Sequence, residues 1–323
     1  MKLTCESEDR GLLFPLAVSH TVVREVRVHR FVYTGAGTRG WSEVATGPWA
    51  PVSANAMREA ADQIAEAVED RNVADADDLA DFLAPYYGKL PTAATLGVEM
   101  AVLDALATAA NEPLWSYLGL PRPDGAPLFT TVDLLDTDRP WTHTPGRYKV
   151  KLGGPDDAAI IASCRGTGSR FLFDVNSGWD LAEYDALAPA LRECDPIGVE
   201  DPVRSLEAIV PRRAQWRRDR IFLDESVRDT DAVRRHGDAA AGINFKLLKF
   251  GGLLPVLDGI RIARAAGAEI GIGCFIEPER SIAYAGALTG LADHVDLDGD
   301  RWLTGAERSR LRLDDGPGIG RTA

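Results

Sequence analysis

The apolar and polar positions of the first 120 residues follow two patterns in succession. In the stretch VVREVRVHRFVYTG, which begins at Val22, apolar and polar residues alternate, and the glycines of GTRGWSEVATG mark bends. The first 50 residues are therefore expected to form an antiparallel sheet. From Ser53, the expected N-cap, apolar residues recur at the helical period, and a second helix is predicted over residues 93–110. Glycine and proline punctuation then predicts a domain boundary near Leu120.

From Pro127 onward, short apolar runs of strand length alternate with stretches of helical character. The runs are LFTTVDL, YKVKLG, FLFDVN, IGVEDP, IFLDES, GINFKL, EIGIGC and HVDLD. Eight strands with intervening crossovers predict a parallel α/β barrel, in which function gathers at the carboxyl ends of the strands. An open doubly wound sheet is the alternative, but no glycine-rich nucleotide-binding loop follows any run. The first two crossovers are short or broken by proline, so the barrel is expected to be irregular on that side.

Several runs end in charged residues of the kinds that catalysis uses. Asp174, Glu200, Asp224 and Lys246 end four successive runs at intervals of 22 to 26 residues. A strand and its return helix need about that length, so these side chains are expected at equivalent places in successive units. If the strands are parallel, the charges share one end of one sheet.

Three of these residues are carboxylates. Asp174, Glu200 and Asp224 supply the hard oxygen ligands that Mg²⁺ takes together with water and substrate oxygens. Three convergent carboxylates repel one another at low dielectric, and a bound cation removes that repulsion. The simpler alternative is that each acid caps the following helix.

Strand alternation also assigns the neighbours of these acids. Asn176 lies two residues beyond Asp174 and so on the same face, where it is expected to bind a water of the metal. Asp201 and Glu225 are expected to point the opposite way and to serve as structural residues or supports of the ligands.

Lysines on two of the runs are candidate bases. Lys149 and Lys151 lie on the same side of their strand, with Lys151 nearer the carboxyl end, and a neighbouring ammonium lowers the pKa of a lysine. On the sixth run, Lys246 is expected inside the barrel, whereas Lys249 lies past the strand and is expected to be solvated. Strands two and six are nearly opposite in a barrel of eight. A substrate between the two bases can therefore lose a proton from one face and regain it on the other.

Composition and charge limit the classes of binding partner that are expected. The 323 residues are 45% hydrophobic, enough for a large core, and the net charge of −13 argues against nucleic acid or an anionic membrane as the main partner. The four cysteines are scattered without a C-x-x-C pair, so neither a disulfide framework nor a zinc site is expected. No apolar run reaches about 18 uninterrupted residues, and GLLFPLAV follows an acidic stretch, so neither a membrane span nor a signal peptide is expected. A cytoplasmic enzyme with a small-molecule substrate is expected, and a homo-oligomer is left open.

The motifs YKVKLGG, FLFDVNSGW, VEDP, LDES and NFKLLKFGG together resemble the enolase superfamily, in its muconate-lactonizing-enzyme subgroup. VEMAVLDALATAANEPLWSYLG resembles the end of that family's N-terminal capping domain. The resemblance implies an α+β capping domain over residues 1–120 and a modified TIM barrel, (β/α)7β, over residues 121–301. It also implies a C-terminal segment, residues 302–323, that packs back on the capping domain.

The resemblance further implies roles at the site. Enolase-superfamily enzymes remove an α-proton from a carboxylate substrate through an enediolate stabilised by Mg²⁺. Carried over to this chain, the metal ligands are Asp174, Glu200 and Asp224, the acid–base pair is Lys151 and Lys246, and Lys149 assists Lys151.

The last run bears on the substrate. DHVDLDGD resembles the D-x-D motif with which dipeptide epimerases hold the substrate's α-ammonium, and the two aspartates are Asp296 and Asp298. Two acids in a polar loop are the simpler alternative. Glu277 lies where the family often reads G-C-M-x-E-S and is expected to contact the substrate, although residues 278–280 depart from that pattern, as VEDP departs from VEQP.

Three classes of function remain. The first is a dipeptide epimerase of the L-Ala-D/L-Glu type. The second is an o-succinylbenzoate synthase, N-succinylamino acid racemase or cycloisomerase on the same scaffold, and the third is a barrel without activity. The retained acids and lysines disfavour the third, and the D-x-D motif favours the first, because the substrate of o-succinylbenzoate synthase has no ammonium. The resemblance also implies that residues 14–22 and 44–52 close over the barrel mouth.

Overall fold

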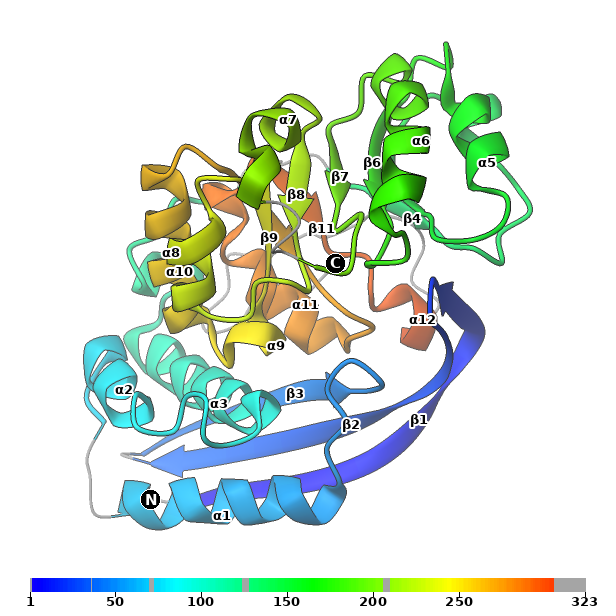
Figure 1. Ribbon diagram of the computed structural model, residues 1–323. Helices are drawn as coiled ribbons and strands as arrows, with labels where there is room; N and C mark the ends of the chain where they lie inside the picture. The colour runs from blue at the N-terminus through cyan, green and yellow to red at the C-terminus, as the bar shows by residue number, and fades with distance from the viewer. Residues whose placement is uncertain (1, 36, 70–72, 124–127, 206–209, 305–323) are drawn as a thin grey trace.

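The computed structural model describes residues 2–35, 37–69, 73–123, 128–205 and 210–304. Its N-terminal part is an antiparallel sheet in the order β1-β2-β3, followed by helices (Figure 1). The elements are β1 (Lys2–Val18), β2 (Thr21–Gly35), β3 (Thr38–Thr46), α1 (Ala54–Glu69), α2 (Ala76–Leu83), α3 (Thr92–Ala110) and α4 (Leu114–Tyr117). The predicted sheet, the two predicted helices and the Ser53 cap are confirmed, since the Ser53 hydroxyl accepts from the Ala56 N–H at 3.1 Å. The helix α2 was not predicted.

Helix α3 is the core of this part and packs between the sheet and the barrel (Figure 1). It approaches β3 so closely that a side chain at Gly40 would meet the backbone of Ala101 and Ala105. By length and composition α3 is apolar enough to cross a membrane, but 78% of that window is buried inside the protein. Its apolar character therefore reflects core packing on two sides.

The second part is an eight-stranded parallel sheet that closes on itself. The strands are β4 (Thr130–Val132), β5 (Arg147–Lys151), β6 (Arg170–Asp174), β7 (Gly198–Glu200), β8 (Ile221–Leu223), β9 (Gly242–Lys246), β10 (Glu269–Gly273) and β11 (His294–Asp296), each paired with the next. A parallel bridge from Leu128 to Val295, with an N–H···O bond of 3.0 Å from Phe129 to Val295, joins the ends of the sheet. The predicted barrel is confirmed, and the open sheet is wrong.

The crossovers between the strands follow the (β/α)7β pattern except in the first of them. Between β4 and β5 the chain forms only a 3-10 turn, Pro140–Thr142, as its two prolines predicted. The later crossovers carry α5 (Asp157–Cys164), α6 (Leu181–Glu193), α7 (Arg213–Arg218), α8 (Thr230–His236), α10 (Leu253–Ala265) and α11 (Glu279–Gly286). Two short helices, α9 (Leu247–Phe250) and α12 (Arg301–Thr304), follow β9 and β11. Of the C-terminal segment, Trp302 packs against Phe14 of β1, and residues 305–323 lie outside the described residues.

Buried polar contacts join the two parts. Arg280 of α11 forms an ion pair of 2.6 Å with Asp104 of α3. Glu99 of α3 is fully buried and accepts hydrogen bonds from Tyr284 (2.7 Å), Tyr87 (3.1 Å) and the first N–H groups of α10. A carboxylate at a helix N-terminus is favoured by the helix dipole. Burial nevertheless raises the pKa of Glu99 to about 7, against the effect of these donors.

This raised pKa predicts a specific pH dependence of stability. The folded protein binds a proton at Glu99 more tightly than the unfolded chain, whose carboxyl titrates near the ordinary value of 4.5. The stabilisation that the proton on Glu99 gives to the folded protein is therefore fully present below about pH 4.5 and is lost as the pH rises through about 7. Relative to Glu99→Gln, the free energy of unfolding of the wild type should fall by about 3 kcal/mol over that range. Urea denaturation at a series of pH values measures it, and parallel curves for the two proteins would contradict it.

Candidate active site at the barrel mouth

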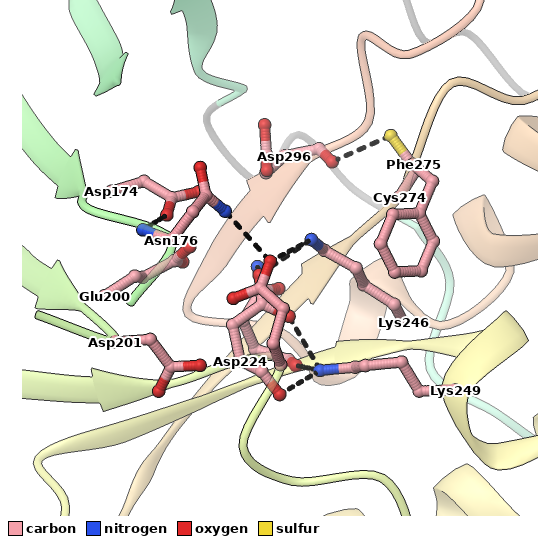
Figure 2. A network of polar contacts seen from close by, with 12 residues as sticks. Asp174, Asn176, Glu200, Asp201, Asp224, Lys246, Lys249, Cys274, Phe275 and Asp296 are labelled. Atoms are coloured by element: carbon pink, nitrogen blue, oxygen red, sulfur yellow. Dashed lines mark hydrogen bonds and ion pairs between the residues drawn. The ribbon is translucent and has the colours of Figure 1, made fainter. Parts of the chain in front are cut away.

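A cavity of about 260 Å³ lies at the carboxyl ends of the barrel strands. Its floor is formed by charged side chains from β5, β9 and β11, and its roof by the β1–β2 hairpin and the segment after β3. The predicted acids and lysines meet at and below this floor. Figure 2 shows the three acids together with Lys246. Parallel strands bring this about because their ends share one rim of the barrel.

The three predicted carboxylates converge. One oxygen each of Asp174, Glu200 and Asp224 lies within 4.8 Å of the others, and all three side chains are buried. The parallel register sets Lys151 opposite Asp174, and Asp174 opposite Glu200, so the neighbouring strand ends are level.

Ammonium groups surround these acids. Lys149 Nζ lies 3.0 Å from Asp174, 2.7 Å from Glu200 and 2.7 Å from Asp296. Burial lowers the pKa of Lys149, but the carboxylates of Asp174, Asp296 and Glu200 outweigh it and hold that pKa well above its ordinary value. Lys149 is therefore charged at neutral pH, with its ammonium placed among the acids.

The acids carry more negative charge than this lysine balances. Burial, together with Asp174 and Asp224, raises the pKa of Glu200 well above its ordinary value despite Lys149. The Glu200 Oε2 atom has the ion pair with Lys149 but no hydrogen bond within the described residues. Three convergent hard oxygen donors, one of them short of partners, fit a divalent cation of the Mg²⁺ kind.

The two candidate bases come from β5 and β9, and both line the cavity. Lys151 Nζ is 2.6 Å from Asp174 and 3.1 Å from Asn176 Oδ1. Lys246 Nζ is 2.7 Å from Asp224, whose carboxylate outweighs the effect of burial and raises the pKa of this lysine. The structure thus brings one lysine from strand two and one from strand six to the same cavity, and their acid–base roles stay predictions.

Two expectations about neighbouring residues were wrong. Lys249 was expected to be solvated, but it is buried and donates to the Asp224 carboxylate (2.7 Å) and to the carbonyls of Asp224 and Asn244. The reason is that α9 begins directly after Lys246, and its turn folds Lys249 back onto β8. Burial lowers the pKa of Lys249, although Asp224 opposes this.

Glu225 was expected to point away from the site, but it lines the cavity. It accepts from Asn176 Nδ2 at 2.9 Å and lies 3.8 Å from Lys246 Nζ. Strand β8 ends at Leu223, so alternation between faces does not extend to this residue. Asp201, its counterpart, accepts from the N–H and hydroxyl of Ser226, and burial and Glu225 raise its pKa to about 8.

The D-x-D aspartates lie together on the cavity wall. Asp298 accepts from the Thr131 N–H (2.8 Å) and hydroxyl (2.9 Å), and Arg301 lies 3.5 Å from it. The same hydroxyl is 3.5 Å from Asp296. Burial, with Asp296 adjacent, raises the pKa of Asp298. Sequence reasoning missed Thr131 because only barrel closure brings β4 beside β11.

Glu277 lies behind the cavity wall. It is buried, it accepts from the Phe275 N–H at 3.0 Å, and it is not among the residues that line the cavity. Burial raises its pKa. Its substrate-binding role stays a prediction, and what the structure describes is a support for the backbone at Phe275.

The hairpin tip is seated on the barrel. The Ser19 hydroxyl donates to the carbonyl of Asn176 at 3.0 Å, and a Cβ atom at Gly178 would lie 2.9 Å from Ser19 Cβ. Leu16, Val18 and other hairpin residues form the apolar part of the roof. Parts of both segments that were expected over the mouth, 14–22 and 44–52, therefore lie there.

Comparison with known proteins identifies the family. Residues 143–322 match the enolase C-terminal domain-like family. A hydrophobic dipeptide epimerase from Roseobacter litoralis is 31% identical over 70% of this chain and 67% of that protein. Another, from a Flavobacteria bacterium, is 30% identical over 92% of this chain and 89% of that protein. The chain belongs to the enolase superfamily, as its motifs predicted.

Solved structures agree on the fold. The dipeptide epimerase from Enterococcus faecalis, complexed with Mg and L-Leu-L-Tyr, has a TM-score of 0.84 at 20% identity and covers 99% of each chain. Muconate lactonizing enzyme from Pseudomonas fluorescens has a TM-score of 0.82 at 20% identity, over 99% of this chain and 95% of that one. The predicted modified barrel with its α+β N-terminal part is confirmed.

The burial of Lys249 predicts a large loss of stability on its removal. Lys249→Met keeps most of the side-chain volume but removes one of the two ammonium groups that pair with the buried Asp224 and the ammonium that donates to two carbonyls. In the metal-free protein it should lower the free energy of unfolding by about 3 kcal/mol. Chemical denaturation in EDTA measures it. The exposed Arg261, paired with Asp258, is the control, and Arg261→Met should barely move the midpoint. Equal effects of the two substitutions would show that Lys249 is solvated after all.

Proposed function

We propose that the protein is a Mg²⁺-dependent dipeptide epimerase. The observation that carries the proposal is the arrangement of one lysine from β5 and one from β9 at a single cavity, beside three convergent carboxylates and a pair of aspartates. Two bases on opposite strands suit an epimerisation, in which one takes the α-proton and the other returns a proton on the opposite face. The family and the relatives named above support the same reaction.

The residues at the site would have three distinct roles. Asp174, Glu200 and Asp224 would hold the Mg²⁺ ion, which supplies positive charge against the negative charge that develops on the substrate carboxylate. Lys151 and Lys246 would move the protons. Lys149 would stay charged and keep Asp174 ionised, and together with the bound Mg²⁺ it would oppose protonation of Glu200.

The D-x-D pair would orient the substrate. Asp296 and Asp298 are carboxylates that can hold an α-ammonium by charge-assisted hydrogen bonds. An ammonium about one peptide unit from the reacting carbon describes a dipeptide with a free N-terminus. The wall and roof are largely apolar, with Leu16, Trp49 and Ile276 among the lining residues, so apolar side chains are the proposed preference.

Three further assignments are part of the proposal. Residues 1–120 form the capping domain and residues 121–301 the catalytic barrel, with the C-terminal segment returning to the capping domain. Asn176 binds a water of the metal. The enzyme acts in the cytoplasm on a small molecule.

Incubation with a dipeptide library in D₂O tests the function, with mass spectrometry reading α-deuteration. The wild type should deuterate both epimers, EDTA should abolish the exchange and Mg²⁺ should restore it. Lys151→Ala and Lys246→Ala should each abolish epimerisation, yet each should still exchange the epimer whose proton faces the surviving lysine. The exposed Lys89→Ala is the control and should leave both exchanges intact. Turnover of succinyl compounds without exchange of any free dipeptide would favour the lyase alternative.

The proposed binding of the substrate's ammonium by Asp296 and Asp298 predicts a second outcome. N-acetylation of a good dipeptide removes the ammonium and should lower kcat/KM by at least about 100-fold, corresponding to about 2.7 kcal/mol. Thr131→Val removes the hydroxyl that holds Asp298 and should lower kcat/KM for the free dipeptide about tenfold, mainly through KM, whereas Thr131→Ser should retain it. Steady-state kinetics measure both effects. Better activity on acylated amino acids than on free dipeptides would contradict the proposal that Asp296 and Asp298 bind the substrate's ammonium.

A further inference from the structure

Two aromatic rings meet at the rim of the cavity from distant parts of the chain. Trp49 follows β3 in the N-terminal part, and Phe275 follows β10 in the barrel. Their ring centroids are 5.1 Å apart and the ring planes are tilted by only 2°. Such a stack is favourable and confines both rings.

The Phe275 ring also contacts a proposed base. Lys246 Nζ lies 4.4 Å from its centroid, and Figure 2 shows the ring beside the lysine side chain. An ammonium over a ring face is attracted by the ring's quadrupole. The ring thus adds a third contact to those with Asp224 at 2.7 Å and Glu225 at 3.8 Å. These three contacts define the position of Nζ.

Both rings are held in place by their surroundings. The N–H of Phe275 donates to the buried Glu277 at 3.0 Å. The Trp49 ring lies so close to Gly47 that a Cβ atom there would meet it at 2.8 Å. The stacked pair is therefore anchored on the barrel side and on the N-terminal side.

The stacked pair lies between two spaces in the protein. Trp49 and Phe275 line the catalytic cavity and also a larger groove of about 690 Å³ between the N-terminal part and the barrel. Arg228 lines both spaces as well, so the stacked rings and this side chain lie between the cavity that holds Lys246 and the groove. A charged group that must move a proton depends on a fixed position and on exclusion of water.

We infer that Trp49 and Phe275 are positioning residues for Lys246, with Phe275 aiming the ammonium and Trp49 holding the ring. The inference rests on the proposed function, in which Lys246 serves one face of the substrate. Lys151 is placed instead by the polar contacts with Asp174 and Asn176. Loss of the ring should consequently impair one face of the reaction and not the other.

Exchange in D₂O, followed separately for each epimer, tests this asymmetry. The epimer that Lys151→Ala still exchanges is the one served by Lys246. In Phe275→Leu, exchange of that epimer should slow about tenfold, while exchange of the other should stay within about twofold. Trp49→Leu should give the same asymmetry. Phe275→Tyr and Trp49→Phe keep the rings and should stay close to the wild type.

Phe82→Leu is the matched control, because it removes a ring from another aromatic pair, with Tyr86, away from Lys246. It should lower the melting temperature without changing the ratio of the two exchange rates. Equal slowing of both epimers by Phe275→Leu, or no slowing, would overturn the inference.

A crystal structure of Phe275→Leu gives a readout that needs no substrate. Lys246 Nζ should leave its position 2.7 Å from Asp224. An unmoved Nζ would overturn the inference even if the enzyme proves inactive on dipeptides. Failure of the wild type to exchange any dipeptide would instead reject the proposed function, and the crystal structure would still decide the role of the ring.

Discussion

The mutual repulsion of three buried carboxylates is the constraint on which the site depends. Asp174, Glu200 and Asp224 lie at the ends of three neighbouring parallel strands, so the strand pairing brings their oxygens within 4.8 Å of one another. Burial makes that repulsion strong, and nearby ammonium groups compensate part of the negative charge. Lys149 lies among the acids, and Lys249 reaches Asp224 from a helix turn behind the strand. The arrangement balances part of the charge and leaves a place that suits a divalent cation.

The N-terminal part completes the site by covering it. Docking through Glu99 and through the Asp104–Arg280 ion pair fixes this part against the barrel. That fixed position brings the hairpin tip onto Asn176 and Trp49 onto Phe275. A covered site has a lower effective dielectric, which strengthens the charge interactions beneath it. Stability of the docking and competence of the site are thus linked.

Much of the fold was predictable because it follows local patterns. Eight short apolar runs with intervening crossovers predicted the barrel, and the near-constant spacing of Asp174, Glu200 and Asp224 predicted that they meet at one end of the sheet. The alternation of side chains between the two faces of a strand gave wrong predictions beyond the ends of short strands. Strand β8 ends at Leu223, and α9 begins directly after Lys246, so Glu225 and Lys249 were assigned to the wrong environments. One residue of strand length decides which face a side chain takes.

The sequence by itself determined which acids and lysines end the strands and in what order, because each belongs to a short segment whose pattern is read locally. Only the tertiary structure decided the contacts across the closed barrel and between the two parts. Thr131 holds Asp298 across 167 residues, and the stack of Trp49 on Phe275 joins the N-terminal part to the barrel. No local pattern specifies such pairs, since they form only when the barrel closes between Leu128 and Val295 and the N-terminal part packs on the barrel. The residues proposed to fine-tune the reaction are therefore those that depend on the assembled fold.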